Sequence, residues 1–201
     1  MTKDWTGNKQ STFATLGASN HSDNTIEEHD FYATDPQSLR IFLNEYLKDN
    51  TLSNKIWEPA CGLGHLSKVL EEYGFEVKST DLVERNFGMG GVDFLLETEK
   101  IDMDILTNPP YNKALEFVEH ALNIQSEGNK TIMFLKIQFL EGQKRLELFR
   151  KHPPKYVYVH SKRQLCFPNG DMSKRISSAT CYCWFVWEKG CKEFPQVRWI
   201  I

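Results

Sequence analysis

Apolar residues recur at helical spacing in four stretches of the chain. The first runs from Leu39 to Leu47, with Pro36 in its first turn and Asp35 placed to cap its N-terminus. The second runs from Leu66 to Tyr73 and is followed by Gly74, the residue type most common just after a helix. The same periodicity predicts helices over residues 115–122 and 140–150.

Short segments between and after these helices predict β-strands. They cover residues 55–58, 76–80, 92–95, 103–107, 131–135, 156–159 and 181–187. Strands that alternate with helices in this way predict an α/β fold with a mostly parallel, seven-stranded sheet and helices on both faces.

The N-terminal residues 1–30 are polar and show no sustained period, which predicts a flexible arm before a domain at 31–201. No apolar run reaches the roughly 18 residues of a membrane-spanning helix, and the first residues lack the apolar core of a signal peptide. The five cysteines contain no C-x-x-C pair and the six histidines show no metal-ligand spacing. We therefore expect a cytoplasmic protein with no disulfide scaffold, metal or membrane partner.

Charge is distributed unevenly, although the net charge of the 201-residue chain is only -3. Residues 136–175 contain ten basic and three acidic residues, a balance of +7, which leaves -10 for the remainder. A basic segment beside an acidic body suits a protein that meets phosphates on one side. A solvated helix face would explain the same charges.

A glycine-containing turn follows the first predicted strand, in the string Glu58-Pro-Ala-Cys-Gly-Leu-Gly64. Gly62 and Gly64 permit tight turning and close approach of a ligand beside a helix N-terminus. The string is not a phosphate loop, and an ordinary tight turn would also account for it. Asp81 ends the next strand, where a carboxylate can bind both hydroxyls of a ribose or merely cap a turn.

The string Asn108-Pro109-Pro110-Tyr111 follows the strand at 103–107. Two prolines hold the backbone in one extended path and fix the direction of the Asn108 amide. Its oxygen and the Pro109 carbonyl can accept the two N–H groups of a conjugated amine, while Tyr111 stacks on a planar substrate. A loop merely stiffened by proline is the alternative.

These strings, in this order and together with Asp93-Phe94, resemble the motifs of S-adenosylmethionine-dependent adenine-N6 DNA methyltransferases. The segment Tyr32–Pro36 resembles the motif that this family places before the glycine loop. The segments Arg163–Gly170 and Cys183–Gly190 resemble the closing segments of small phage-type members, so the similarity spans residues 31–190. It implies a Rossmann-like class I methyltransferase fold, S-adenosylmethionine as cofactor, DNA as partner, and a flipped adenine as methyl acceptor.

The resemblance also assigns residues to the cofactor. Asp81 would bind the ribose, Asp93 the amino group of the cofactor adenine, and Phe94 would lie beside that ring. The methionine portion would lie against a group from two separate motifs: Tyr32, Thr34, Glu58, Cys61, Gly62 and Gly64.

On the acceptor side, Asn108 and Pro109 would bind the target amine, with Pro110 stiffening the loop and Tyr111 stacking on the flipped base. Phe167 would form the opposite stacking wall, unless it is a core aromatic. Candidates for contacts to phosphates or bases are Arg145, Arg163 and Arg175.

The chain lacks room for the separate target-recognition domain of larger members, so we expect a monomer or homodimer that reads few bases. The Asn-Pro-Pro-Tyr string also serves adenine in RNA and glutamine in translation release factors. The basic segment favours nucleic acid over a protein substrate. A module that binds DNA without modifying it is a third interpretation, which the intact residues 108–111 oppose.

Overall fold

The computed structural model describes residues 32–162, 164, 166–168 and 180–201. The expected arm at 1–30, Arg163 and Arg175 lie outside these residues. For Tyr32 and Phe167 the backbone is described, but not the side chain.

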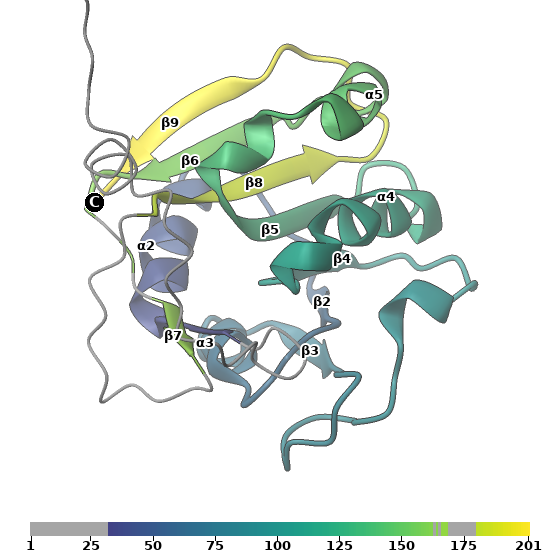
Figure 1. Ribbon diagram of the computed structural model, residues 1–201. Coiled ribbons are helices and arrows are strands. Elements are labelled where there is room, and N and C mark those ends of the chain that lie inside the picture. Colours follow the sequence, from purple (N-terminus) through teal and green to yellow (C-terminus); the bar gives the residue numbers. More distant parts are fainter. Residues whose placement is uncertain (1–31, 163, 165, 169–179) are drawn as a thin grey trace, which may run out of the picture.

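A seven-stranded sheet forms the centre of the molecule (Figure 1). Its strand order is β3-β2-β4-β5-β8-β6-β9. The strands β2 to β5 are parallel to one another, β8 runs antiparallel between β5 and β6, and β9 is parallel to β6. Their bounds are β2 Lys55–Glu58, β3 Glu76–Ser79, β4 Asp104–Thr107, β5 Lys130–Lys136, β6 Tyr156–His160, β8 Tyr182–Glu188 and β9 Gln196–Ile200.

Helices cover both faces of this sheet. On one face lie α2 (Pro36–Tyr46) and α3 (His65–Glu72), and on the other lie α4 (Ala114–Ile124) and α5 (Leu146–Lys151). Alternate residues of each central strand point to opposite faces, so each strand is buried on both sides and contributes to two apolar cores.

The position of α2 is fixed at its start and along its buried face. The Asp35 side chain accepts a hydrogen bond from the Gln37 backbone N–H at 2.9 Å, as the sequence pattern predicted. Phe42 stacks on Trp184 of β8 at 5.2 Å between ring centroids, and the Trp184 indole N–H donates to the Ser38 hydroxyl at 3.2 Å. These contacts hold α2 against the middle of the sheet.

The α/β fold with a mostly parallel seven-stranded sheet is confirmed, but two predicted elements are wrong. Residues 92–95 do not form a strand, because the Asp93 carboxylate accepts from the Leu95 N–H and starts a 3₁₀ helix, η1 (Phe94–Leu96). The continuous helix predicted at 140–150 is broken at Gly142, whose φ is 109°. Two 3₁₀ turns, η3 (Ile137–Leu140) and η4 (Gln143–Arg145), precede α5 there.

Three short strands were not predicted. One is β9, which replaces 92–95 as the seventh strand of the sheet. The other two, β1 (Tyr32–Thr34) and β7 (Cys166–Pro168), pair antiparallel in a separate two-stranded sheet.

Asp104, at the start of β4, is buried and joins three segments through its carboxylate. It accepts from the Ser53 and Lys130 backbone N–H groups, each at 2.7 Å. Asp104→Ala leaves two buried donors without a partner, so we expect it to lower the free energy of unfolding by roughly 2–5 kcal/mol in urea denaturation. The exposed neighbour provides a control: Asp102→Ala should change it by less than about 0.5 kcal/mol. Equal effects of the two substitutions would contradict this role.

Candidate functional site

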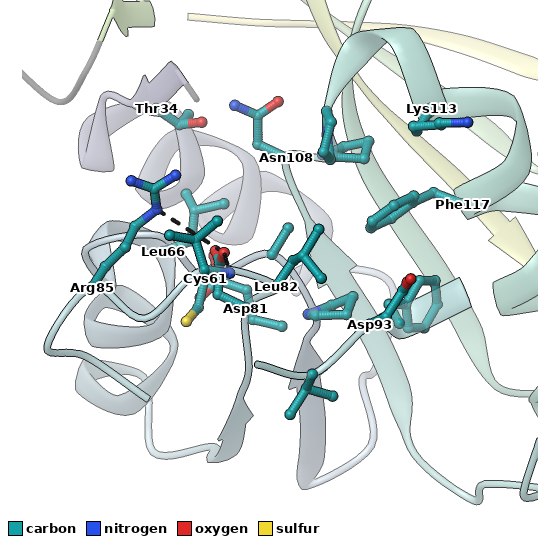
Figure 2. Close-up of a pocket in the computed structure, with 18 of the residues that line it drawn as sticks. Thr34, Cys61, Leu66, Asp81, Leu82, Arg85, Asp93, Asn108, Lys113 and Phe117 are labelled. Atoms are coloured by element: carbon teal, nitrogen blue, oxygen red, sulfur yellow. Dashed lines mark hydrogen bonds and ion pairs between the residues drawn. The ribbon is translucent and has the colours of Figure 1, made fainter. Parts of the chain in front are cut away.

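A cavity of about 200 Å³ opens at the carboxyl ends of β2 and β4. These two strands are adjacent and parallel, while β3 pairs with the other side of β2, so the chain connections diverge between them. Such a point of divergence is where open α/β sheets bind ligands. Figure 2 shows residues from the loops after β2, β3 and β4, together with Thr34 of β1, converging on this cavity.

The glycine-containing turn after β2 forms one wall of the cavity. Gly62 and Gly64 have φ values of 55° and 76°, in the left-handed region that favours glycine. The Gly64 N–H donates to the Cys61 carbonyl at 2.8 Å, which closes the turn. A Cβ atom added to Gly64 would lie 2.3 Å from the Phe87 ring, so both the conformation and the packing require glycine there.

Asp81, just after β3, fastens this turn to the neighbouring strand. Its carboxylate accepts from the Gly62 N–H at 2.8 Å and from the Val83 N–H at 2.9 Å. The Arg85 Nε lies 4.0 Å from the same carboxylate, and both side chains line the cavity (Figure 2). Asp81 therefore orders two loops of the site at once.

Glu58 ends β2 and is 1% exposed. The Ser67 hydroxyl of α3 donates to its carboxylate and also lies 2.6 Å from the Ser79 hydroxyl. Burial raises the pKa of Glu58 to about 8, although the hydrogen bonds from Ser67 oppose this shift. Burial therefore favours the neutral acid form of Glu58, which lines the cavity.

Asp93 lies on a different wall of the cavity from Thr34 and Arg85 (Figure 2), and the next residue, Phe94, also lines the cavity. Phe94 is buried, and its ring packs against those of Trp57 at 5.2 Å and Phe117 at 4.9 Å between centroids. This wall is apolar apart from the Asp93 carboxylate, a combination suited to a flat ring with an amino group.

The string 108–111 leaves the end of β4 directly into the cavity. The side-chain oxygen of Asn108 is shielded from solvent. Tyr111 begins the 3₁₀ helix η2 (Tyr111–Lys113), and its ring lies 5.8 Å from that of Tyr182 and 4.9 Å from the Lys136 ammonium. Turn and string thus face one cavity, although they are more than 40 residues apart in the sequence.

The remaining predicted residues are only partly placed. The β1–β7 pairing sets Ala33 opposite Phe167, which brings two sequence motifs together at the level of the backbone. Arg145 does not line the cavity: its guanidinium donates to the carbonyls of Glu141 and Gln138 and stabilises the turn before α5.

The described part of the basic segment extends from one end of the strands to the other. The strands β5 and β6 are both antiparallel to β8 and hence parallel to each other. Lys136 ends β5 and Lys162 follows β6, so both lie on the side of the sheet where the carboxyl ends of the parallel strands carry the cavity. Lys155 precedes β6 and pairs with Glu188 at the end of β8, so it lies at the opposite end of the strands. The charges of this segment therefore do not form one face.

Sequence reasoning missed several lining residues. Leu82, Arg85, Lys113 and Phe117 lie one to six residues beyond the motifs that were recognised. A signal was present for the two cations, since each lies within four residues of a predicted site residue at a strand end. The direction of their side chains depends on the path of the loops, which the sequence pattern does not give.

Solved structures share this architecture at low sequence identity. A putative class I S-adenosylmethionine-dependent methyltransferase from Listeria monocytogenes matches with a TM-score of 0.57 and 12% identity over 95% of this chain and 71% of that one. A modification subunit of a putative type I restriction enzyme from Vibrio vulnificus gives 0.59 and 9%, over 95% of this chain and 50% of that one. A putative RNA methyltransferase from Pyrococcus horikoshii gives 0.56 and 13%, over 90% and 99%.

The fold is that of the class I methyltransferases. No family model matches the chain, and no curated protein sequence matches it. Within the described residues, no helix has the length and apolar character needed to cross a membrane, and no group of three or more potential ligands could hold a metal.

The protonated state of Glu58 can be tested through the pH dependence of stability. An unfolded Glu ionises near pH 4.5 and the folded one near 8, so between these values unfolding releases a proton. Wild type should therefore lose stability relative to Glu58→Gln as the pH rises through this interval, by up to roughly 1.4 kcal/mol per pH unit in urea unfolding. The exposed Glu99→Gln serves as control and should follow the wild-type curve. Parallel curves for wild type and Glu58→Gln would show that Glu58 is ionised in the folded protein.

Proposed function

We propose that this protein transfers a methyl group from S-adenosylmethionine to the N6 amino group of adenine in DNA. The observation that carries the proposal is the opening of residues 108–111 onto the same cavity as the glycine turn, Asp81 and Asp93. One cavity then holds the methyl donor and the reacting nitrogen together.

The lining of the cavity fits S-adenosylmethionine. Asp93 and Phe94 suit the adenine ring, and Asp81 lies where a ribose would meet the end of β3. The Thr34 hydroxyl is buried at the cavity with no hydrogen-bond partner among the described residues, as expected of a group that meets a polar ligand. When bound, this cofactor supplies an electrophilic methyl group on a sulfonium sulfur.

The acceptor chemistry follows from the backbone at 108–111. The lone pair of an adenine N6 is delocalised into its ring, so the nitrogen is a poor nucleophile. The Asn108 oxygen and the Pro109 carbonyl accept its two N–H groups, which favours a tetrahedral nitrogen with its lone pair directed at the methyl group. As the nitrogen–methyl bond forms, the methyl–sulfur bond of the sulfonium would break to leave a neutral thioether, and one N–H proton of the acceptor would pass to solvent.

The target nitrogen lies inside a DNA duplex, so the base must leave the stack to reach the cavity. Tyr111 offers the flipped base a stacking surface, and its ring is itself held by Tyr182 and Lys136. We assign catalysis to residues 31–201, acting as a monomer or homodimer.

Cationic side chains at the cavity edge favour a nucleic acid. Lys113, Lys136 and Lys162 lie at the carboxyl ends of β4, β5 and β6, close to where phosphates would flank a flipped base. The restriction-modification neighbour supports DNA. The neighbour described as an RNA methyltransferase, which this chain covers almost completely, makes RNA the second candidate.

Asn108→Ala tests the proposed chemistry. We expect the rate of methyl transfer to fall by at least about 100-fold, because one of the two acceptors for the amine is lost, while affinity for S-adenosylmethionine changes little. Single-turnover transfer of labelled methyl to DNA, followed by digestion and analysis for N6-methyladenine, measures the first quantity, and calorimetry measures the second.

Asn123→Ala, an exposed asparagine in α4, is the matched control and should retain activity. Offering structured RNA and a release factor in parallel separates the acceptors. Product in RNA alone, or on glutamine alone, would overturn the DNA assignment, and full activity of Asn108→Ala would overturn the mechanism.

Phosphate contact can be tested through salt dependence. Lys136→Gln should weaken binding of duplex DNA and reduce the slope of log K against log salt by about 1, because one fewer counterion is released. Lys151→Gln removes an exposed lysine near the end of β8, at the end of the strands opposite the cavity, and should leave the slope unchanged. Fluorescence anisotropy at several salt concentrations measures both, and equal slopes for the two variants would contradict the proposed DNA-facing edge.

A further inference from the structure

Arg85 has no assigned role, although it lines the cavity from the loop that follows Asp81. Its side chain is 21% exposed, so most of it lies inside the protein. In Figure 2 the guanidinium lies on the same side of the cavity as Thr34, while Asp93, Phe117 and Lys113 lie on the other side.

The positively charged side chains that line the cavity lie on two different sides of it. Among the described residues that line it, Arg85 and Lys113 are the two with a lysine or arginine side chain. His65 also lines it, but burial and the nearby Lys68 lower its pKa, which leaves the imidazole neutral at pH 7. Lys113 pairs with Glu116 at 3.6 Å beside the string at 108–111. Among the described lining residues, Arg85 is therefore the fixed cation at the end of the cavity near Thr34.

The proposed cofactor has one anionic group, the carboxylate of its methionine portion. If its adenine meets Asp93 and Phe94, the methionine portion extends toward the opposite side, where Thr34 and Arg85 lie. A guanidinium binds a carboxylate through two parallel N–H donors, and partial burial strengthens that pair. A Lys ammonium lacks this planar geometry.

We infer that Arg85, assisted by the Thr34 hydroxyl, binds the carboxylate of the cofactor's methionine portion. This inference rests on the cofactor and its orientation in the proposed function, but not on the identity of the methyl acceptor. The ion pair between Arg85 and Asp81, at 4.0 Å, then also directs the guanidinium toward the cavity.

The test compares two ligands that differ in this carboxylate alone: S-adenosylmethionine and its decarboxylated form. Calorimetric titration without any methyl acceptor gives both affinities, so the result is independent of the substrate. Wild type should bind S-adenosylmethionine roughly 10- to 100-fold more tightly than the decarboxylated ligand. Arg85→Gln should lose most of this preference, through weaker binding of S-adenosylmethionine and unchanged binding of the decarboxylated ligand.

Two further variants sharpen the comparison. Arg85→Lys keeps the charge without the planar fork and should retain part of the preference. Arg150→Gln removes an exposed arginine of α5 that does not line the cavity and should bind both ligands as wild type does.

Three outcomes would overturn the inference. Equal weakening of both ligands in Arg85→Gln would assign Arg85 to support of Asp81 and the glycine turn. A preference that survives in Arg85→Gln would place the carboxylate elsewhere, for example at the N-terminus of α3. Absence of binding of S-adenosylmethionine to wild type would overturn the cofactor and, with it, the proposed function, whereas failure of methyl transfer to DNA alone leaves the role of Arg85 standing.

Discussion

The order of strands around β2 is the constraint on which the site depends. Because β3 pairs with one side of β2 and β4 with the other, the helices that follow β2 and β4 cover opposite faces of the sheet. The loops after these two strands therefore separate and leave a cavity between them. The Gly62 and Val83 N–H groups both donate to the Asp81 carboxylate, and these hydrogen bonds fix the loop after β3 against the turn after β2. The strand order therefore determines where the cavity lies, and the Asp81 carboxylate holds two of its loops in place.

The central strands could be predicted because burial on both faces gives continuous apolar runs, as in β5 and β8. The edge strand β9 gave no such signal, since it exposes Val197 and Trp199 and carries Arg198 between them. The pairing of β1 with β7 joins segments more than 130 residues apart, and no local pattern specifies a contact of that kind. At 92–95 the local chemistry of Asp93 overrode an apolar pattern.

The same contrast applies to the site. Cys61, Asp81 and Asn108 were found because each lies just past the end of a predicted strand, and parallel strands have their carboxyl ends on the same side of the sheet. Arg85 was not found, because the turns between Asp81 and Val92 decide where its side chain points. For the basic segment, closeness in the sequence was misleading. Its charges lie at both ends of the strands, since the chain returns from the carboxyl end of β5 to the amino end of β6.

Glu58 and Asp81 both line the cavity, but the surroundings of their carboxyl groups differ. The Asp81 carboxylate accepts hydrogen bonds from two backbone N–H groups and lies within ion-pair distance of Arg85. Glu58, in contrast, accepts from the Ser67 hydroxyl and is almost fully shielded from solvent. Burial therefore favours the neutral acid form of Glu58. The neutral acid avoids an unpaired buried charge, and only a cation placed beside Glu58 would favour its ionised form.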